Sequence, residues 1–269
     1  MDSGNTQKLI RSSQGLRQIS SHSLVLLLLW ALVSPEAGAY VSIRSSNGVA
    51  ARWSQGSNIT VRSNEKISSG MSGADIFTVF TNSLNRWKQA AASGFGFTFF
   101  QGTDTSLYPV FPNVTTDSEI FFTSQTSSNF QIQCGTIAIT QIYFEQGNGN
   151  AQRFDIRFND NCYQFTNTAS DTGVGNRIFL GDVATHELGH GLGLDHSQNL
   201  QSAMVYTAAN GMSKPSCDDQ AAMTDLFNPG AAPSNITGRV QTSTGASVYG
   251  AHVNAISLER GEVLASTIS

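Results

Sequence analysis

The sequence predicts an α+β domain, with helices packed on a mixed or antiparallel sheet. The first observation is the amount of apolar material: the chain has 269 residues and is 39% hydrophobic, enough for one sizeable core with room for a small second module. The second is the order of the patterned segments, which runs strand, helix, several strands, helix, helix and a β-type end. Strands grouped in this way, without regular alternation with helices, are typical of the α+β class.

The composition and the net charge of the chain exclude some classes of function and favour others. Charged residues make up 13% of the chain, about half the usual share. The net charge is −4, and no basic stripe is present that could neutralise phosphates. We therefore expect no nucleic-acid partner, and the weakly charged surface favours a secreted protein.

The N-terminus has the pattern of a secretory signal peptide. Basic residues precede the apolar run Leu24–Val33, and the small-x-small sequence "AGA" follows it. Ten apolar residues fall short of the roughly 20 that span a bilayer, so we expect no stable membrane span. The interpretation is that residues 1–39 are cleaved near Ala39 and that the mature protein is extracellular.

The first elements are a strand and a long helix. Residues 51–64 alternate, with Trp53, Ile59 and Val61 on one face. Ser72 and Asp75 then form a capping-box signature. Apolar residues recur after it at helical spacing until two glycines end the pattern: Ile76, Phe80, Leu84, Trp87 and Ala91, then Gly94 and Gly96.

Four further segments are predicted as strands. They are residues 97–102, 118–124, 136–145 and 153–160. The last contains Phe154, Ile156 and Phe158 in alternation with polar neighbours. Residues 159–176 are rich in Asn, Asp, Thr and Gly, and we interpret them as a loop.

Two helices follow the loop. The first covers residues 180–192, with Asp182 near its start. The second begins at a capping box of Ser216 and Asp219, and its apolar stripe comprises Ala222, Met223, Leu226 and Phe227. Residues 229–235 indicate a linker, and residues 236–269 are β-type.

The predicted site lies in "HELGHGLGLDH", which begins at His186. His186 and His190 are four residues apart and share one helix face, so they can bind a single ion. Gly191 and Gly193 weaken the helix and allow the chain to turn, which brings His196 toward the same ion. Three imidazoles with a fourth position open for water are the ligand set of a catalytic zinc.

Glu187 lies beside the first ligand but off the ligand face, where it can accept a proton from the water at the open position. The alternative is that these histidines are scattered by chance. That alternative is reasonable for an HExxH match alone, but here the third histidine, the glycine and the helical pattern must all coincide.

The stretch "HELGHGLGLDHSQNLQSAMVY" resembles the metzincin metallopeptidases. It is most similar to their matrixin branch, because Ser197 follows the third histidine, Met204 follows eight residues after it, and the last helix begins with Asp218–Asp219. The resemblance covers roughly residues 40–228. It implies a zincin domain with a mixed, mostly parallel twisted sheet, an active-site helix and a C-terminal helix.

The resemblance also implies roles for individual residues. The chain would be a zinc endopeptidase for protein or peptide substrates, and we expect a monomer. An edge strand, here "DIRFND", would pair with the substrate. Met204 would form the Met-turn beneath the zinc. Tyr206 fits the Ser-x-Met-x-Tyr pattern of astacins and serralysins, whose tyrosine approaches the zinc, although the short spacing to Met204 favours a packing role.

The sequence departs from animal matrixins in several features. No cysteine-switch propeptide motif precedes the first strand, so the resemblance is to bacterial-type members. Only His22 and His252 lie outside the motif, too few for the family's second, structural zinc. Asp160 and Asp171 are candidate Ca²⁺ ligands, but without EF-hand-like spacing a solvated loop is favoured.

The cysteines and the C-terminal segment leave alternatives open. Three cysteines allow at most one intrachain bridge, and we expect Cys134 to pair with Cys162, leaving Cys217 as a buried thiol. Residues 236–269 resemble the start of a carboxypeptidase-regulatory-like or Ig-like β module, too short to bury its own core. We expect one of three explanations for this tail: it is truncated in this sequence, it is disordered, or it docks on a partner. The alternative function is a catalytically silent zinc-binding protein or a surface adhesion protein that uses the tail.

Overall fold

The computed structural model describes residues 40–64, 70–92, 94–102, 117–125, 132–173, 176–207, 210–228 and 236–269. These all belong to one compact unit, Ala37–Ser269. The predicted signal peptide and the predicted linker 229–235 lie outside the described residues. Among the described helices, none combines the length and the apolar character needed to cross a bilayer.

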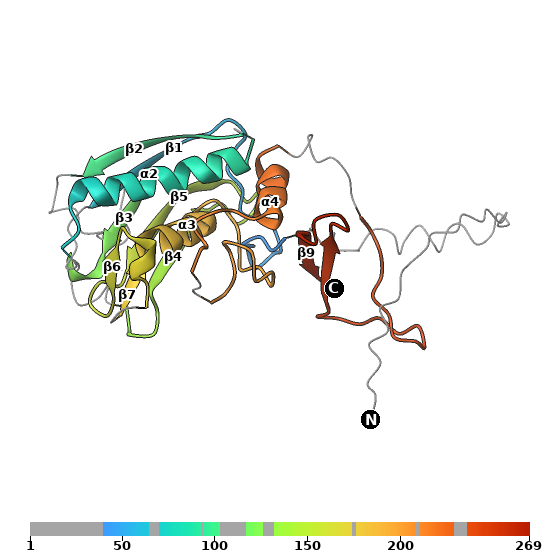
Figure 1. Cartoon of the computed structure of the whole chain (residues 1–269). Coiled ribbons are helices and arrows are strands. Elements are labelled where there is room, and N and C mark those ends of the chain that lie inside the picture. The colour runs from blue at the N-terminus through green and yellow to red at the C-terminus, as the bar shows by residue number, and fades with distance from the viewer. Residues whose placement is uncertain are drawn as a thin grey trace, which may run out of the picture. The chain divides into compact units, whose positions relative to one another are not determined.

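A five-stranded sheet forms the base of the domain (Figure 1). Its strands are β1 (Asn58–Asn64), β2 (Gly96–Gly102), β3 (Ser118–Phe122), β4 (Ala138–Phe144) and β5 (Ala151–Phe158). Their spatial order is β2-β1-β3-β5-β4, and every neighbouring pair is parallel except β4 with β5. The predicted α+β class with a mixed, mostly parallel sheet is confirmed.

The prediction that residues 155–160 form an edge strand was wrong. "DIRFND" falls largely in β5, which pairs with β3 on one side and β4 on the other. β4 is the end strand on this side of the sheet, and β2 is the end strand on the other. The two strands form a hairpin, and both alternate in sequence, so local pattern alone cannot tell which of them joins β3.

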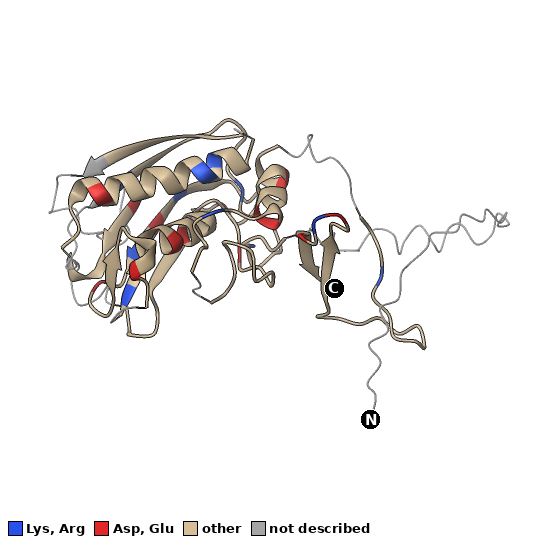
Figure 2. Ribbon diagram, viewed as in Figure 1, with Lys and Arg blue, Asp and Glu red and all other residues tan. Residues whose placement is uncertain are grey.

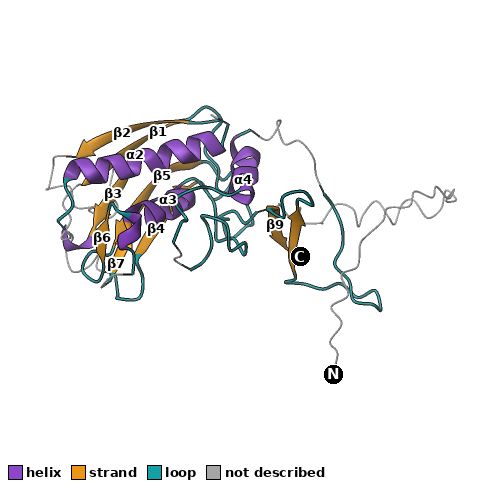
Figure 3. Cartoon of the chain, viewed as in Figure 1, coloured by secondary structure: helices purple, strands orange, loops and turns teal. Residues whose placement is uncertain are grey.

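Three helices accompany the sheet: α2 (Gly73–Ala90), α3 (Leu180–Gly191) and α4 (Cys217–Phe227). Figure 3 shows α2 and α3 lying against the same face of the sheet. The capping boxes at Ser72 and Ser216 are both present, as predicted. Each uses a side chain to satisfy backbone N–H groups that the first helical turn leaves free.

The core lies between this face of the sheet and the helices. Phe154, Ile156 and Phe158 of β5 point into it and are fully buried. Phe158 contacts Phe80 of α2, with ring centroids 5.5 Å apart. Trp87 of α2 donates its indole N–H to the carbonyl of Thr185 on α3, 2.7 Å away. The indole therefore ties the two helices together beneath the predicted site.

The opposite face of β5 carries charge. Arg153 and Asp155 form a buried ion pair of 3.3 Å, and the Arg153 guanidinium lies 4.2 Å from the centre of the Tyr143 ring. Elsewhere charged residues are sparse along the ribbon, with acidic and basic positions interspersed (Figure 2). The alternation of β5 keeps this pair on the side of the sheet away from the helices.

The region expected to be one loop has short regular elements. β6 (Gln164–Thr166) pairs in parallel with β7 (Arg177–Phe179), and a 3₁₀ turn lies at Ala169–Asp171. Phe165 of β6 is buried against Phe158, with ring centroids 5.6 Å apart. Together with the partly buried Tyr163 and Ile178, this aromatic anchor explains why a polar segment adopts a defined conformation here.

The predicted disulfide between Cys134 and Cys162 is present. Cys217 was expected to be buried, and this was wrong, because it is half-exposed at the start of α4. The first turn of a helix leaves one side open to solvent, and that position cannot be read from the chain alone.

The tail forms a hairpin of β8 (His252–Ile256) and β9 (Val263–Ile268). β9 packs on α4 through Ser266, which is buried. The Ser266 N–H donates to Asp218 Oδ1 at 2.6 Å, and its hydroxyl donates to Asp218 Oδ2 at 3.0 Å. The segment therefore docks on its own domain through hydrogen bonds to α4, which give the hairpin contacts that an isolated two-stranded hairpin lacks.

Candidate metal centre

Three histidine side chains meet at the C-terminal end of α3. The ligand atoms of His186, His190 and His196 all lie within 4.8 Å of one another. Among the described residues, these three form the one group of His, Cys, Asp or Glu side chains that could hold a metal ion. The ring centroids are 4.7 Å apart for His186 and His190 and 5.2 Å for His186 and His196. The predicted convergence is present.

A glycine turn at the end of α3 brings His196 back. The N–H of Leu194 donates to the carbonyl of Gly189, and that of Gly193 to the carbonyl of His190, both at 3.0 Å. This pair of bonds is a Schellman motif, which needs a left-handed residue just past the helix. Gly193 supplies it with a φ of 107°.

After this turn, residues 193–197 form backbone hydrogen bonds with a neighbouring segment on each side. On one side, Ile43 N–H donates to the Gly193 carbonyl and Asp195 N–H to the Val41 carbonyl, both at 2.9 Å. On the other side, Ser197 N–H donates to the Met204 carbonyl at 2.7 Å. His196 thus projects from a strand-like segment that is paired on both sides.

The ring nitrogens suit zinc. Nδ1 of His186 lies 2.8 Å from the Ala203 carbonyl, and Nδ1 of His190 lies 2.7 Å from the Leu194 carbonyl. A carbonyl only accepts, so each Nδ1 carries the proton and each Nε2 presents a lone pair. The two Nε2 atoms are 3.1 Å apart, close to the separation of about 3.3 Å expected for two nitrogens on one tetrahedral zinc. The donor set therefore fits a zinc ion.

The electrostatics keep the imidazoles neutral. Burial, followed by the neighbouring His190, lowers the pKa of His186 to about 3. Burial is also the main cause that lowers the pKa of His190 and of His196. Neutral imidazole is the form that coordinates a metal, so the site is prepared for binding at neutral pH.

The side chain of Glu187 extends from α3 toward the end strand β4. This side chain is buried, and Thr140 of β4 donates its hydroxyl to Glu187 Oε2 at 2.6 Å. Burial raises the pKa of Glu187 to about 7, while the Thr140 hydrogen bond acts in the opposite direction. A carboxyl group with a pKa near neutrality suits proton transfer.

Met204 packs beneath the histidines. Its sulfur occupies the space beside Gly189, where an added Cβ would lie 2.2 Å from Sδ. Asp219 holds the turn, because its Oδ2 accepts from the Ala203 N–H at 2.8 Å. The Ala203 carbonyl is the acceptor for His186, so Asp219 supports a histidine through the backbone of this turn.

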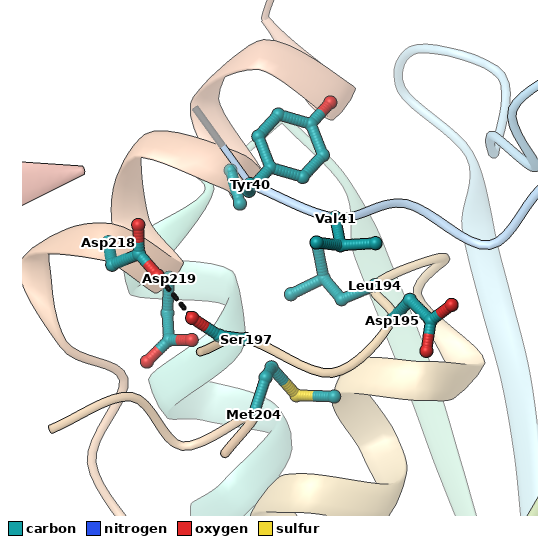
Figure 4. A pocket seen from close by; sticks show the side chains of 9 residues that line it. Tyr40, Val41, Leu194, Asp195, Ser197, Met204, Asp218 and Asp219 are labelled. Carbon is teal, nitrogen blue, oxygen red and sulfur yellow. Dashed lines mark hydrogen bonds between the residues drawn. The ribbon is translucent and has the colours of Figure 1, made fainter. Parts of the chain in front are cut away.

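A small cavity is lined in part by Asp195 and Ser197, the residues on either side of the third histidine in the sequence (Figure 4). There Ser197, which follows His196, donates to Asp218 Oδ2 at 2.7 Å. Burial raises the pKa of Asp218, and the Ser197 and Ser266 hydrogen bonds oppose that rise. The cavity is lined by Tyr40, Val41, Leu194, Asp195, Ser197, Met204, Asp218, Asp219 and Ala222.

The other residues predicted for the site, Tyr206, Asp160 and Asp171, are not part of the histidine cluster. The Tyr206 ring is 4.7 Å from that of His196, and its residue is 74% exposed, so it lies at the rim of the centre rather than in the core. Asp160 accepts from the Ser124 N–H at 2.7 Å, and Asp171 accepts from Thr166 at 3.3 Å. These two carboxylates are engaged in local hydrogen bonds, and they do not form a cluster with other ligands in the described chain.

The supporting roles of Thr140 and Ser197 were not predicted from the sequence. Thr140 carried a signal, because it is a hydroxyl residue in a row of inward-facing positions that is otherwise apolar: Ala138, Ile142 and Phe144. Ser197 was noted for the resemblance alone. Its partner Asp218 is 21 positions away, and no local pattern links the two.

Comparison with known families gives one match. The matrixin family model matches residues 52–228, well over half of the chain. The matched range contains the sheet, the three helices, the histidines and the Met204 turn. No curated protein matches the chain.

Proposed function

The chain belongs to the matrixin family of zinc metallopeptidases. We propose that it is a secreted endopeptidase in which Glu187 is the general base. The observation that carries the proposal is the pairing of three converging, neutral imidazoles with a buried carboxyl group next in sequence. Zinc held by such imidazoles supplies a Lewis acid that polarises the scissile carbonyl and increases the acidity of water.

The role of Glu187 is proton transfer. Its carboxylate takes a proton from the attacking water as the oxygen–carbon bond forms. It returns that proton to the amine nitrogen as the carbon–nitrogen bond breaks. The pKa of about 7 supports both halves of this cycle, since the group can accept and release a proton near neutral pH.

The end strand β4 offers the substrate a place to bind. Its outer side has no partner strand among the described residues. An extended peptide can add to such an edge through main-chain hydrogen bonds, which do not depend on substrate sequence. A peptide bound along β4 passes Thr140 and Glu187. Because such pairing uses the main chain and needs no free terminus of the substrate, it supports cleavage within a chain.

The test compares casein cleavage by the wild-type protein and Glu187→Gln, with zinc content measured for both. We expect Glu187→Gln to retain zinc and lose activity by about 10²–10⁴-fold. Glu259→Gln makes the same change at an exposed position and serves as the control. Undiminished cleavage by Glu187→Gln would remove the base assignment, and an inactive wild-type protein with stoichiometric zinc would favour the silent zinc-binding alternative.

Secretion and endopeptidase action are tested separately. Expression in a secreting host followed by N-terminal sequencing should give a mature chain that begins near Tyr40. Peptides blocked at both ends should still be cleaved. Cleavage of unblocked peptides alone would show an exopeptidase.

A further inference from the structure

Thr140 is a polar residue in an apolar position. On β4, alternate side chains face the helices, and Ala138, Ile142 and Phe144 pack against the core. Thr140 belongs to the same row. A hydroxyl at such a position costs free energy unless it is hydrogen-bonded, so its partner indicates why it is there.

That partner is Glu187. The Thr140 oxygen lies 2.6 Å from Glu187 Oε2 and 3.1 Å from the Glu187 carbonyl oxygen. Among the described residues, no other group donates to this carboxylate. The Thr140 hydroxyl has one proton to donate. It donates that proton to Glu187 Oε2, which is the nearer of the two oxygens.

The contact fixes a side chain that would otherwise rotate. A glutamate has three side-chain torsions, and its helix position constrains mainly the first. A hydrogen bond to a carboxylate is short and about twice as strong as one between neutral groups. With Oε2 held by β4, Oε1 is the oxygen available to exchange a proton.

We propose that Thr140 is a positioning residue that orients the Glu187 carboxylate from the end strand. The inference rests on the proposed function and deepens it. Because Thr140 belongs to the strand along which the peptide would pair, the same element aligns both the scissile bond and the base. Proper orientation of a reacting group is worth large factors in rate.

The experiment compares Thr140→Val and Thr140→Ser. Valine keeps the shape and removes the hydroxyl, whereas serine keeps the hydroxyl. We expect kcat to fall about 10-fold or more in Thr140→Val, with KM within about twofold of wild type, because one charged hydrogen bond is lost. Thr140→Ser should restore most of kcat. Thr78→Val makes the same change on an exposed face of α2 and should leave both kcat and KM unchanged.

Three further measurements separate a positioning role from a structural one. Zinc content should match wild type in each variant. The midpoint of thermal unfolding should stay well above the assay temperature, although Thr140→Val loses some stability because the buried Glu187 carboxylate loses its donor. In the Glu187→Gln background, Thr140→Val should cause no further loss of residual activity. Should Thr140→Val fail to fold, Thr140→Ala removes the same hydroxyl without adding bulk.

The outcomes distinguish the two proposals. Wild-type kcat in Thr140→Val, equal losses in the Val and Ser variants, or additive losses with Glu187→Gln would each overturn the positioning role. A wild-type protein whose cleavage does not depend on Glu187 would instead overturn the proposed function.

Discussion

His186 is tied to Ala203 by a hydrogen bond of 2.8 Å from its ring to the backbone carbonyl. The two residues are 17 positions apart, and the bond joins the metal-binding helix to the turn that contains Met204. The conformation of this turn therefore determines the orientation of the first histidine. Changes beneath the site should weaken metal binding even where no ligand is replaced.

Gly189→Ala tests the packing between α3 and Met204. The new methyl group would lie 2.2 Å from Met204 Sδ and 2.8 Å from the Trp87 ring, so the turn or the helix must shift. We expect a loss of about 1–3 kcal/mol in the free energy of unfolding, together with weaker zinc binding. Urea unfolding and chelator competition measure the two effects. Gly147→Ala has open space around it and should change neither.

Gly193→Ala tests the turn that returns His196. Alanine is strained at a φ of 107°, and its methyl group would lie 2.7 Å from the Ala51 carbonyl oxygen. We expect a stability loss of about 1–3 kcal/mol or more, with reduced zinc affinity. Gly48→Ala also has a positive φ, but open space, so it should lose less stability and keep zinc. Equal zinc affinity in the two variants would show that the turn does not position His196.

Asp218 gives a pH-dependent prediction. Burial raises its pKa in the folded protein above the ordinary aspartate value of about 3.9. A raised pKa means that its contribution to stability is fully present below the unfolded-state value and is lost as the pH rises through the folded-state value. Asp218→Asn removes this dependence. The wild type should therefore lose stability relative to the variant as the pH rises from about 3.9 upward.

Denaturant unfolding of both proteins at a series of pH values measures the difference, since all other titrating groups are shared. The asparagine oxygen can still accept from the Ser266 N–H, and its amide can donate to the two serine hydroxyls. Stability curves that run parallel across the whole acid range would contradict a raised pKa at Asp218.

Ser266→Asp tests the docking of the tail. The new carboxylate would lie beside the buried Asp218, because the Ser266 hydroxyl that it replaces is 3.0 Å from Asp218 Oδ2. Two negative charges this close repel strongly in a low-dielectric environment. We expect the hairpin to detach from α4, with faster amide hydrogen exchange in β9 and in the first turn of α4. Leu258→Asp adds the same charge to the hairpin at a position that is 95% exposed, and it should leave the exchange unchanged. Protection in β9 that persists in Ser266→Asp would contradict the docking.

Features that depend on local hydrogen bonds and on short spacing could be predicted from the sequence. Ser72 and Ser216 specify helix starts because each cap joins residues three positions apart. His186 and His190 share a face because of the helical period, and Gly193 returns the chain because it alone tolerates the required backbone angle. These relations span a few residues, so the histidine site could be predicted before the fold was known.

The contacts between distant segments could not be predicted from the sequence and became clear from the folded structure. β4, not β5, forms the edge because the hairpin pairs with β3 through β5, a choice that both strands' patterns allow. Thr140 meets Glu187 across 47 positions, and Asp218 meets Ser266 across 48. Such contacts form when the chain closes large loops around a shared core, and the pairing that wins depends on total burial rather than on the local sequence.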